Sequence, residues 1–571
     1  MLKAKLLILL TIIFGTVILS LTMIRSGSLY DFGIGFWGPN GHDAIWHLSL
    51  INQLKKQIPP LNPIYSGQIL TNYHWGFDFF AAIISKLFFL SPIFVYFKLL
   101  PIIFALSIGI LSFYLVKLVT KNNLTALLFT LFNYFAGSFG WIITLIREGK
   151  MGGESLFWSM QSASTLLNPP YALSLILLLI GFIFWIKNKN SNKFFIGVLT
   201  GVFFGLISIV KIYATIPIGI AFVLYFTFKY LQTKKISVFN LSLWISFALT
   251  SFLLLYFLGA LRNSTLLEFK PFWFEHSMIE SLDKLYLPKL SSLRTTLASN
   301  IVFIKLPILL AIEASLFFIF LLGNMGVRIL GFWTIFQKII KNKLNDFEIL
   351  LITSMFFSLL IPHIFIQKGT AWNTIQFFYY FLFFSNFFLA QFITNIFQKH
   401  NLKNYLVTSL LIIISIIGSI ATIKDYLGNP PPAALPRNEI VALNFLKNQK
   451  KGIVLTYPYD QYKKEELKLK TPIPLYLYET TAYVSAFTEN QSYLEDEMNT
   501  DITGLDWKIR RNESLKFFNS TDKFFGRGFL LNNKIDYIYL VDAQNFVFQT
   551  TDIFVDKIFD NGLVKIFKVE K

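Results

Sequence analysis

Two short stretches near the start of the chain bring together residues that can move protons. The first, GHDAIWH, contains His42, Asp43 and His47, and the second, NYHWGFD, contains His74 and Asp78. In each stretch an aspartate and a histidine are four residues apart, so a helix would place them on one face, one turn apart. A carboxylate that an imidazole orients, or with which it shares a proton, can act as a general base. We therefore predict a site here.

Two other interpretations of these residues remain open. They can be helix caps at a membrane interface, where Trp46, Tyr73 and Trp75 would form an aromatic belt. Histidine and aspartate at helical spacing can also coordinate a divalent metal ion. Because the spacing fixes no third ligand, we predict no cofactor and keep a divalent metal as the alternative.

The elements that must position these residues are membrane helices. Of 571 residues, 54% are hydrophobic and only 15% are charged, which is typical of a membrane protein rather than a soluble domain. Runs long enough to span a hydrocarbon core of about 30 Å predict about eleven crossings. They occupy residues 4–24, 93–119, 124–146, 171–186, 194–210, 212–231, 238–261, 307–330, 347–366, 377–397 and 405–423.

The short loops predict the orientation. Basic residues gather in every second loop, in register with Lys3 and Lys5, so these loops and the N-terminus are predicted to be cytoplasmic. We attribute the net charge of +19 to basic residues that set the membrane topology, and we therefore expect no nucleic-acid partner. Residues 25–92, 147–170, 262–306, 367–376 and the tail would lie on the other side of the membrane. We expect residues 77–90 to form a short interfacial helix, because a crossing there would invert every later loop.

The composition changes at Pro430, Pro431 and Pro432, which mark a linker. Beyond it, helix-like segments (439–449, 513–519) alternate with strand-like ones (452–457, 535–541), and Asn561-Gly562 predicts a hairpin within 555–569. We predict a transmembrane domain over residues 1–428, with outer-loop helices at 41–56 and 74–91, and a small extracytoplasmic α/β domain over 429–571. There is no cysteine, so no disulfide supports it.

This organisation resembles the GT-C superfamily of integral-membrane glycosyltransferases. The likeness lies in GHDAIWH, in NYHWGFDFFAA, and in the tail segments LNFLKNQ, GIVLTYP and NKIDYIYL. The resemblance implies an α-helical polytopic membrane protein that transfers a sugar from a polyprenyl-phosphate carrier to a glycan, lipid or protein acceptor at the extracytoplasmic face. It also implies that Asp43, with His42 and His47, is catalytic and removes the proton of the acceptor hydroxyl.

A lipid-phosphate leaving group calls for cations, since negative charge develops on it. We predict Lys368 as the first choice for this cation, because Trp372 and Asn373 lie beside it, and Lys211, between two apolar runs, as the second. These residues are predicted to bind substrate together with His74 and Asp78. The alternative for each lysine is a residue that snorkels to the interface. Glu313, inside a predicted crossing, would pair with a lysine or line a cavity.

The sequence departs from the superfamily pattern at two places. Asp43 is flanked by His42 and Ala44 rather than by a second acid, and residues 147–170 contain no DxD motif. The other function classes kept open are a transporter or flippase for lipid-linked glycans, a polymerase or ligase for them, and a non-catalytic membrane scaffold.

Overall fold

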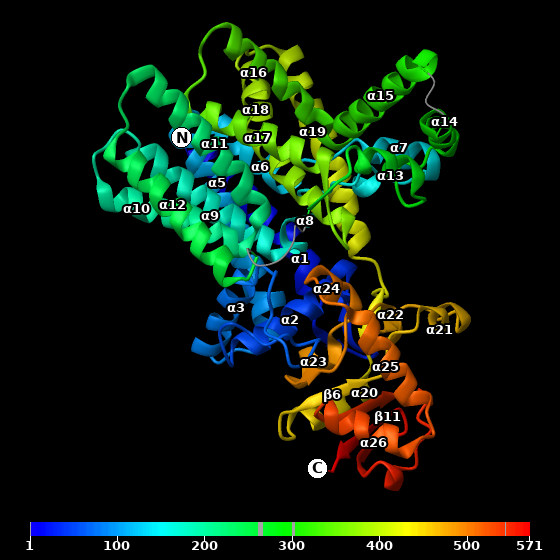
Figure 1. Cartoon of the computed structure of the whole chain (residues 1–571). Helices are drawn as coiled ribbons and strands as arrows, with labels where there is room; N and C mark the ends of the chain where they lie inside the picture. Colours follow the sequence, from blue (N-terminus) through cyan, green and yellow to red (C-terminus); the bar gives the residue numbers. More distant parts are fainter. Residues whose placement is uncertain (1, 261–266, 300–302, 543, 571) are drawn as a thin grey trace. The chain divides into compact units, whose positions relative to one another are not determined.

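A computed structural model describes residues 2–260, 267–299, 303–542 and 544–570 (Figure 1). Contacts within the chain divide it into two compact units. The membrane unit comprises Met1–Ser20, Ile102–Phe257 and Leu261–Asp425, and the loop–tail unit comprises Leu21–Pro101, Leu258–Ala260 and Tyr426–Lys571. The first outer loop therefore groups with the tail, whereas the sequence-based boundary at residue 428 separates them. The start of the predicted loop 262–306 and its residues 300–302 lie outside the described residues.

Within the described residues, each apolar run that the sequence identifies is mostly helical. The helices are α1 (Leu2–Ile24), α5 (Leu100–Thr120), α6 (Asn123–Phe135), α7 (Gly140–Glu148), α9 (Pro169–Asn188), α10 (Phe194–Val210), α11 (Ile212–Thr233), α12 (Val238–Phe257), α15 (Leu306–Met325), α16 (Gly331–Ile340), α17 (Asp346–Ile364), α18 (Ile375–Phe397) and α19 (Leu402–Tyr426). This confirms the predicted polytopic helical fold.

Fewer helices than the roughly eleven predicted crossings reach full spanning length. Among the described residues, nine helices are long and apolar enough to span a membrane, or ten if α6 and α7 count as one span. The run 124–146 is broken between these two helices, which are bent by 47°. Helix α10 has 17 residues, and at about 1.5 Å per residue it is about 26 Å long, short of a core of about 30 Å.

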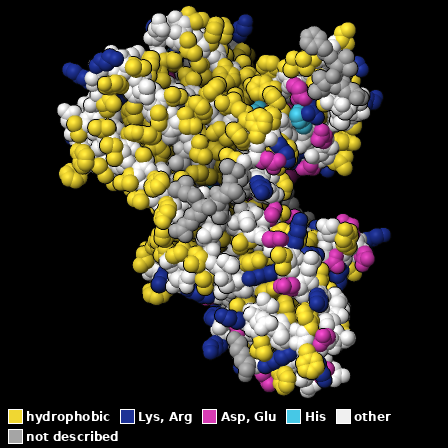
Figure 2. Space-filling view, viewed as in Figure 1, with side chains coloured by type: hydrophobic (Ala, Val, Ile, Leu, Met, Phe, Trp, Pro, Cys, Tyr) yellow, Lys and Arg dark blue, Asp and Glu magenta, His cyan; other side chains and the backbone are white. Residues whose placement is uncertain are grey.

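Small residues allow α10 to pack closely on α12. Gly197, Gly201 and Gly205 repeat every four residues, and a Cβ at Gly197 or Gly201 would lie 2.0 Å from a serine oxygen of α12. Such small-xxx-small faces bring membrane helices together where no hydrophobic driving force acts between them. Among the described spans, the one that contains helix α18 is the most enclosed, since 94% of its apolar stretch is buried inside the protein. Hydrophobic side chains cover much of the visible face of this unit (Figure 2), as expected for a surface in lipid.

One sheet of the loop–tail unit joins the beginning and the end of the chain. Its order is β1-β2-β5-β7, with β1 (Ser28–Tyr30) and β2 (Gly33–Phe36) from the first loop. Strands β5 (Ala433–Leu435) and β7 (Ile473–Pro474) come from the tail. Strand β2 is antiparallel to β5, with Ile34 opposite Leu435. The loop and the tail thus share backbone hydrogen bonds.

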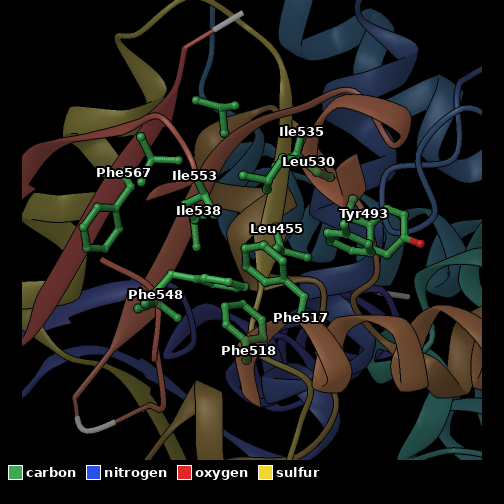
Figure 3. Close-up of a cluster of buried hydrophobic side chains, with 14 of the residues drawn as sticks. Leu455, Tyr493, Phe517, Phe518, Leu530, Ile535, Ile538, Phe548, Ile553 and Phe567 are labelled. Atoms are coloured by element: carbon green, nitrogen blue, oxygen red, sulfur yellow. The ribbon is translucent and has the colours of Figure 1, made fainter. Parts of the chain in front are cut away.

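The second sheet forms the predicted α/β domain. Its order is β10-β11-β9-β6-β8, in which β6 (Ile453–Thr456), β8 (Gln491–Ser492) and β9 (Ile535–Val541) are parallel. Strands β10 (Val555–Asp560) and β11 (Val564–Val569) form the expected hairpin, with Gly562 at φ +86° in the turn. Helices α20 (Arg437–Lys447), α25 (Trp507–Asn519) and α26 (Lys523–Asn532) complete it. Figure 3 shows Phe517 and Phe518 of α25 packed with Leu455 and Ile538 of the sheet.

Gly33 is required where β2 meets β5, which gives a test of this sheet. Its φ is +119°, and a Cβ there would lie 2.0 Å from the carbonyl oxygen of Leu435. We expect Gly33→Ala to lower the free energy of unfolding of the loop–tail unit by about 2 kcal/mol or more, since backbone strain and a steric clash add. Thermal unfolding and limited proteolysis of the purified protein measure this.

Gly528→Ala is the matched control. Gly528 lies in α26, and a Cβ there has open space within 4 Å. This change should leave stability unchanged or raise it slightly, because alanine favours helix. Equal stability of the Gly33→Ala and Gly528→Ala proteins would contradict the β2–β5 pairing.

Candidate functional site

Asp43 is the first residue of helix α2 (Asp43–Leu54), and it is exposed. Its side chain is 58% accessible, although almost every other residue of α2 is buried. A carboxylate in the first turn of a helix is stabilised by the positive end of the helix dipole. The chain enters α2 through a 3-10 turn, Gly38–Gly41, that leaves His42 at the N-cap position. Asp43 can therefore reach a solute while its backbone is held in a packed helix.

His42 links Asp43 to a second aspartate, Asp496, from the tail. Its Nδ1 hydrogen-bonds to Asp43 Oδ1 at 2.9 Å, and its Nε2 lies 3.3 Å from Asp496 Oδ1. Burial alone would lower the pKa of His42, but the two carboxylates outweigh burial and raise this pKa well above its ordinary value. The charged form of the imidazole is therefore favoured, with one carboxylate near each ring nitrogen.

Asp496 was missed in the sequence because its partners lie far away in the chain. It is buried, has φ +44°, and caps helix α24 (Glu497–Ile502). Its Oδ1 accepts a hydrogen bond from the Asn499 backbone at 3.0 Å, and its Oδ2 accepts one from the Asn499 side chain at 2.7 Å. Three consecutive acids, Glu495-Asp496-Glu497, were the available signal in the sequence.

His47 pairs with Asp78 across two helices, not within one. His47 Nδ1 and Asp78 Oδ1 are 2.7 Å apart, both side chains are buried, and the His47 ring stacks near Tyr96 at 5.7 Å between centroids. Helix α3 (Gly76–Leu87) carries Asp78, and it begins after His74. The predicted common helical face of His74 and Asp78 is therefore wrong, because the chain is not yet helical at His74. The pair holds α2 against α3.

Helix α3 is also too short to cross a membrane. Its 12 residues extend about 18 Å, against a hydrocarbon core of about 30 Å. This agrees with the prediction of a short helix in the segment 77–90.

A pocket of about 470 Å³, including space open to solvent, lies beside Asp496. We call it the acidic pocket. Four acidic side chains and five tyrosines line it. These residues are Glu479, Glu495, Asp496, Glu497, Tyr457, Tyr459, Tyr476, Tyr483 and Tyr539. All belong to the loop–tail unit, as do Asp43 and His42.

The four acids of the acidic pocket differ in their charged neighbours and in the effect of burial on their pKa values. Glu497 forms an ion pair with Arg511, and Asp496 faces His42. Burial raises the pKa of Glu495 to about 7, although Ser485 and Ser492 donate hydrogen bonds to it. Burial is also the main cause of the raised pKa of Glu479, which the charge of Asp43 raises further and that of His42 lowers.

In the membrane unit, Lys211 lies where α10 ends and where three other helices, α9, α11 and α18, begin. It is 3% exposed and is the N-cap residue of α11. Its Nζ donates to Asn168 Oδ1 at 3.1 Å, and Asn168, the N-cap residue of α9, donates to Gln376 in the first turn of α18 at 3.2 Å. Helix N-termini carry partial positive charge. With the lysine, they make this cluster suited to an anion.

Lys368 and its neighbours lie in the turn between α17 and α18. Lys368 is exposed, Trp372 is 44% exposed, and Asn373 is half-buried. Asn373 Oδ1 accepts a hydrogen bond from Gln376 at 3.4 Å, and Gln376 also bonds Asn168. Asn373 thus belongs to the hydrogen-bonded cluster of Lys211, while Lys368 is solvated. Burial makes Lys211 the stronger of the two candidate cations.

The acid within a predicted crossing, Glu313, has partners. Its carboxylate contacts His276 Nε2 at 2.7 Å and Arg294 Nε at 2.8 Å. A further buried pair, His363 and Glu275, has 3.0 Å between Nε2 and Oε1. These contacts neutralise acids that would otherwise be costly beside a membrane. Glu313 is therefore paired with an arginine and a histidine rather than with a lysine.

The described ranges contain no group of three or more His, Asp or Glu side chains arranged to hold a metal ion. His47 and Asp78, which the sequence offers as potential ligands, instead contact each other.

Together, these features define a multi-pass membrane protein with an extended loop–tail unit that carries an exposed aspartate beside a pocket. Comparisons with protein-family models and with curated proteins find no match. Among solved structures, the chain is similar to the Archaeoglobus fulgidus oligosaccharyltransferase tethered to an acceptor peptide, with a TM-score of 0.50 and 13% identity over 94% of this chain and 69% of that one. The chain thus shares its fold with that oligosaccharyltransferase, in agreement with the polytopic helical architecture that the sequence predicts.

Other solved structures are less similar to this chain. They include the mycobacterial arabinofuranosyltransferase AftD, with a TM-score of 0.45 and 12% identity over 96% of this chain and 40% of AftD. At these identities, likeness concerns the fold, and function must come from the site.

Proposed function

We propose that this protein transfers a sugar from a polyprenyl-phosphate carrier to an acceptor at the extracytoplasmic membrane face, with Asp43 as the general base. The observation that carries the proposal is an exposed carboxylate, Asp43, whose neighbour His42 is buried and held between two aspartates. A general base needs access to the hydroxyl and a fixed orientation, and Asp43 has both. The fold supports the proposal by analogy, because a protein of this fold is an oligosaccharyltransferase.

The acceptor half of the reaction uses the loop–tail unit. Asp43 accepts the proton of the acceptor hydroxyl as that oxygen attacks the anomeric carbon of the donor sugar. A new C–O bond forms, the bond from the anomeric carbon to the phosphate oxygen breaks, and its electron pair leaves with the phosphate. His42 is a positioning residue that fixes the Asp43 carboxylate and balances its charge.

The donor half uses the Lys211 cluster. Negative charge grows on the leaving phosphate, and a cation held in a poorly hydrated site stabilises it more than one in water. Lys211 is buried and lies at helix N-termini, so it is our first candidate for this role. Trp372 and Asn373 are candidates to contact the donor sugar.

His42→Gln tests the positioning role. We expect its turnover number to fall about tenfold or more, because a charge-assisted hydrogen bond contributes about 1.5–3 kcal/mol. The raised pKa of His42 means that the cation is present at neutral pH and is lost as pH rises through that pKa. Wild-type activity should therefore decline on the alkaline side, and the variant should lack this decline. Rates of transfer between pH 6 and pH 9 measure both effects.

His400→Gln is the control, because His400 is an exposed histidine of the membrane unit. An identical alkaline decline in wild type and in His42→Gln would remove His42 from the proposed role.

Transfer itself is tested with the purified protein in liposomes. Synthetic polyprenyl phosphates and diphosphates that carry radiolabelled sugars are offered with a mixture of glycan, lipid and peptide acceptors. We expect label to move to an acceptor from at least one polyprenyl phosphate. Movement of intact lipid-linked sugar across the bilayer, with no transfer from any donor, would instead identify a flippase and overturn the proposal.

A further inference from the structure

We propose that the acidic pocket binds a sugar residue of the acceptor, so that the acceptor of the reaction proposed above is a neutral glycan. This inference rests on the proposed function and names its acceptor class.

The position of the pocket follows from the order of the strands. Thr456 ends β6 and Tyr457 to Tyr459 follow it, Leu494 to Glu497 follow β8, and Gln544 follows β9. These three strands are parallel, and β8 and β9 lie on opposite sides of β6. In open α/β sheets, ligands bind outside the carboxyl ends of the strands where the order reverses. The acidic pocket occupies that place.

The lining of the pocket matches a ligand rich in hydroxyl groups. Ionised carboxylates only accept hydrogen bonds, and they can accept from neighbouring hydroxyls of one ring. Tyrosine rings offer flat apolar faces with a polar end, which suits the two kinds of surface on a sugar. The side chain of Thr481 lines the pocket, is 6% exposed, and has no hydrogen-bond partner among the described residues. A buried hydroxyl without a partner is costly unless a ligand supplies one.

The lining disfavours anionic ligands, although Glu497 is paired with Arg511 and Asp496 faces His42. The described lining residues include four acids and neither lysine nor arginine. A uronic acid or a phosphate there would face like charges at short range. The pocket is therefore not a second site for the donor phosphate, and it should reject acidic sugars.

The geometry favours a compact group over an extended peptide. A peptide that adds to a sheet pairs along a free strand edge. The acidic pocket instead lies at the ends of strands, and β6 and β9 are interior strands of their sheet.

The pocket is also connected to the proposed base. Asp496 lines the pocket and lies 3.3 Å from His42, which in turn contacts Asp43. A glycan seated in the acidic pocket would thus be held within the same small network as the carboxylate that accepts its proton.

Binding without donor tests the inference. The full-length protein in nanodiscs is titrated by calorimetry with a set of neutral disaccharides, their uronic-acid counterparts and a lysine-containing tripeptide. We expect at least one neutral disaccharide to bind, and its uronic-acid counterpart to bind at least tenfold more weakly. Glu479→Gln should weaken binding about tenfold or more, and Thr481→Val about threefold to tenfold, since one charge-assisted and one neutral hydrogen bond are removed.

The matched controls are Glu466→Gln and Thr521→Val, at exposed positions of the same unit. They should leave affinity unchanged. Binding of the tripeptide in place of every disaccharide, equal binding of uronic acids, or no effect of the Glu479 and Thr481 variants would each overturn the pocket assignment.

Different experimental outcomes would overturn the transfer reaction and the pocket assignment. Asp43→Asn should still bind the disaccharide, because Asp43 is not part of the pocket lining. Sugar binding that depends on Glu479, with no transfer from any donor, would overturn the transfer reaction alone. Transfer with unaltered kinetics in the Glu479 and Thr481 variants would overturn the pocket assignment alone.

Discussion

Asp43→Asn should abolish sugar transfer, with a fall in the turnover number of at least about 10²- to 10⁴-fold, the usual contribution of a general base. Asparagine keeps the shape and can still accept a hydrogen bond from His42, but it cannot take a proton at neutral pH. Because the Asp43 side chain is 58% exposed, the change should not disturb packing. Initial rates with radiolabelled donor in liposomes measure the loss.

Asp501→Asn provides the matched control for Asp43. Asp501 is an exposed aspartate in α24 of the same unit. It should retain wild-type activity, and both variants should have the wild-type unfolding temperature. Full transfer by Asp43→Asn would show that another group removes the proton.

Lys211→Met is expected to have the second largest effect. Methionine keeps most of the apolar stem and removes the charge, so the leaving phosphate would lose a cation. Loss of one preorganised donor of this kind typically costs about 10²- to 10³-fold in turnover. We expect that loss together with a raised KM for the donor, while the KM for the acceptor stays unchanged. Lys211→Arg should restore part of the activity because it restores the charge.

Two further lysines make the comparison specific. Lys368→Met tests the exposed candidate, and we expect a change of only a few fold because a solvated charge is screened. Lys343→Met, at an exposed position between α16 and α17, should have no effect. A larger loss for Lys368→Met than for Lys211→Met would reverse the assignment of the phosphate-binding cation.

Hydropathy and local pattern were sufficient for most of the fold. The apolar runs are mostly helical, since a segment in lipid must satisfy its own backbone hydrogen bonds. The tail elements were also predictable, because IDYIYLV and the Asn561-Gly562 turn have strong β signals and form β9 and the β10–β11 hairpin. The number of crossings was less predictable. The break between α6 and α7 follows from local backbone geometry that hydropathy does not detect.

The candidate site was predictable only in part. Spacing identified His42, Asp43, His47 and Asp78, but it suggested partners four residues apart within each helix. The observed His47–Asp78 contact joins two helices, and the His42–Asp496 contact joins the first loop to the tail. Such contacts between distant residues depend on tertiary packing, which a local pattern does not determine.

The sheet β1-β2-β5-β7 has a consequence for biosynthesis. Strand β2 emerges from the ribosome early, but its partner β5 follows only after the membrane helices have been made. The interior of the loop–tail unit therefore stays incomplete during most of translation, with a strand edge open to wrong partners. His42 likewise meets Asp496 only near the end of synthesis. A ribosome-stalled nascent chain that lacks the tail should expose the first loop to protease and remain inert until its final segment is synthesised.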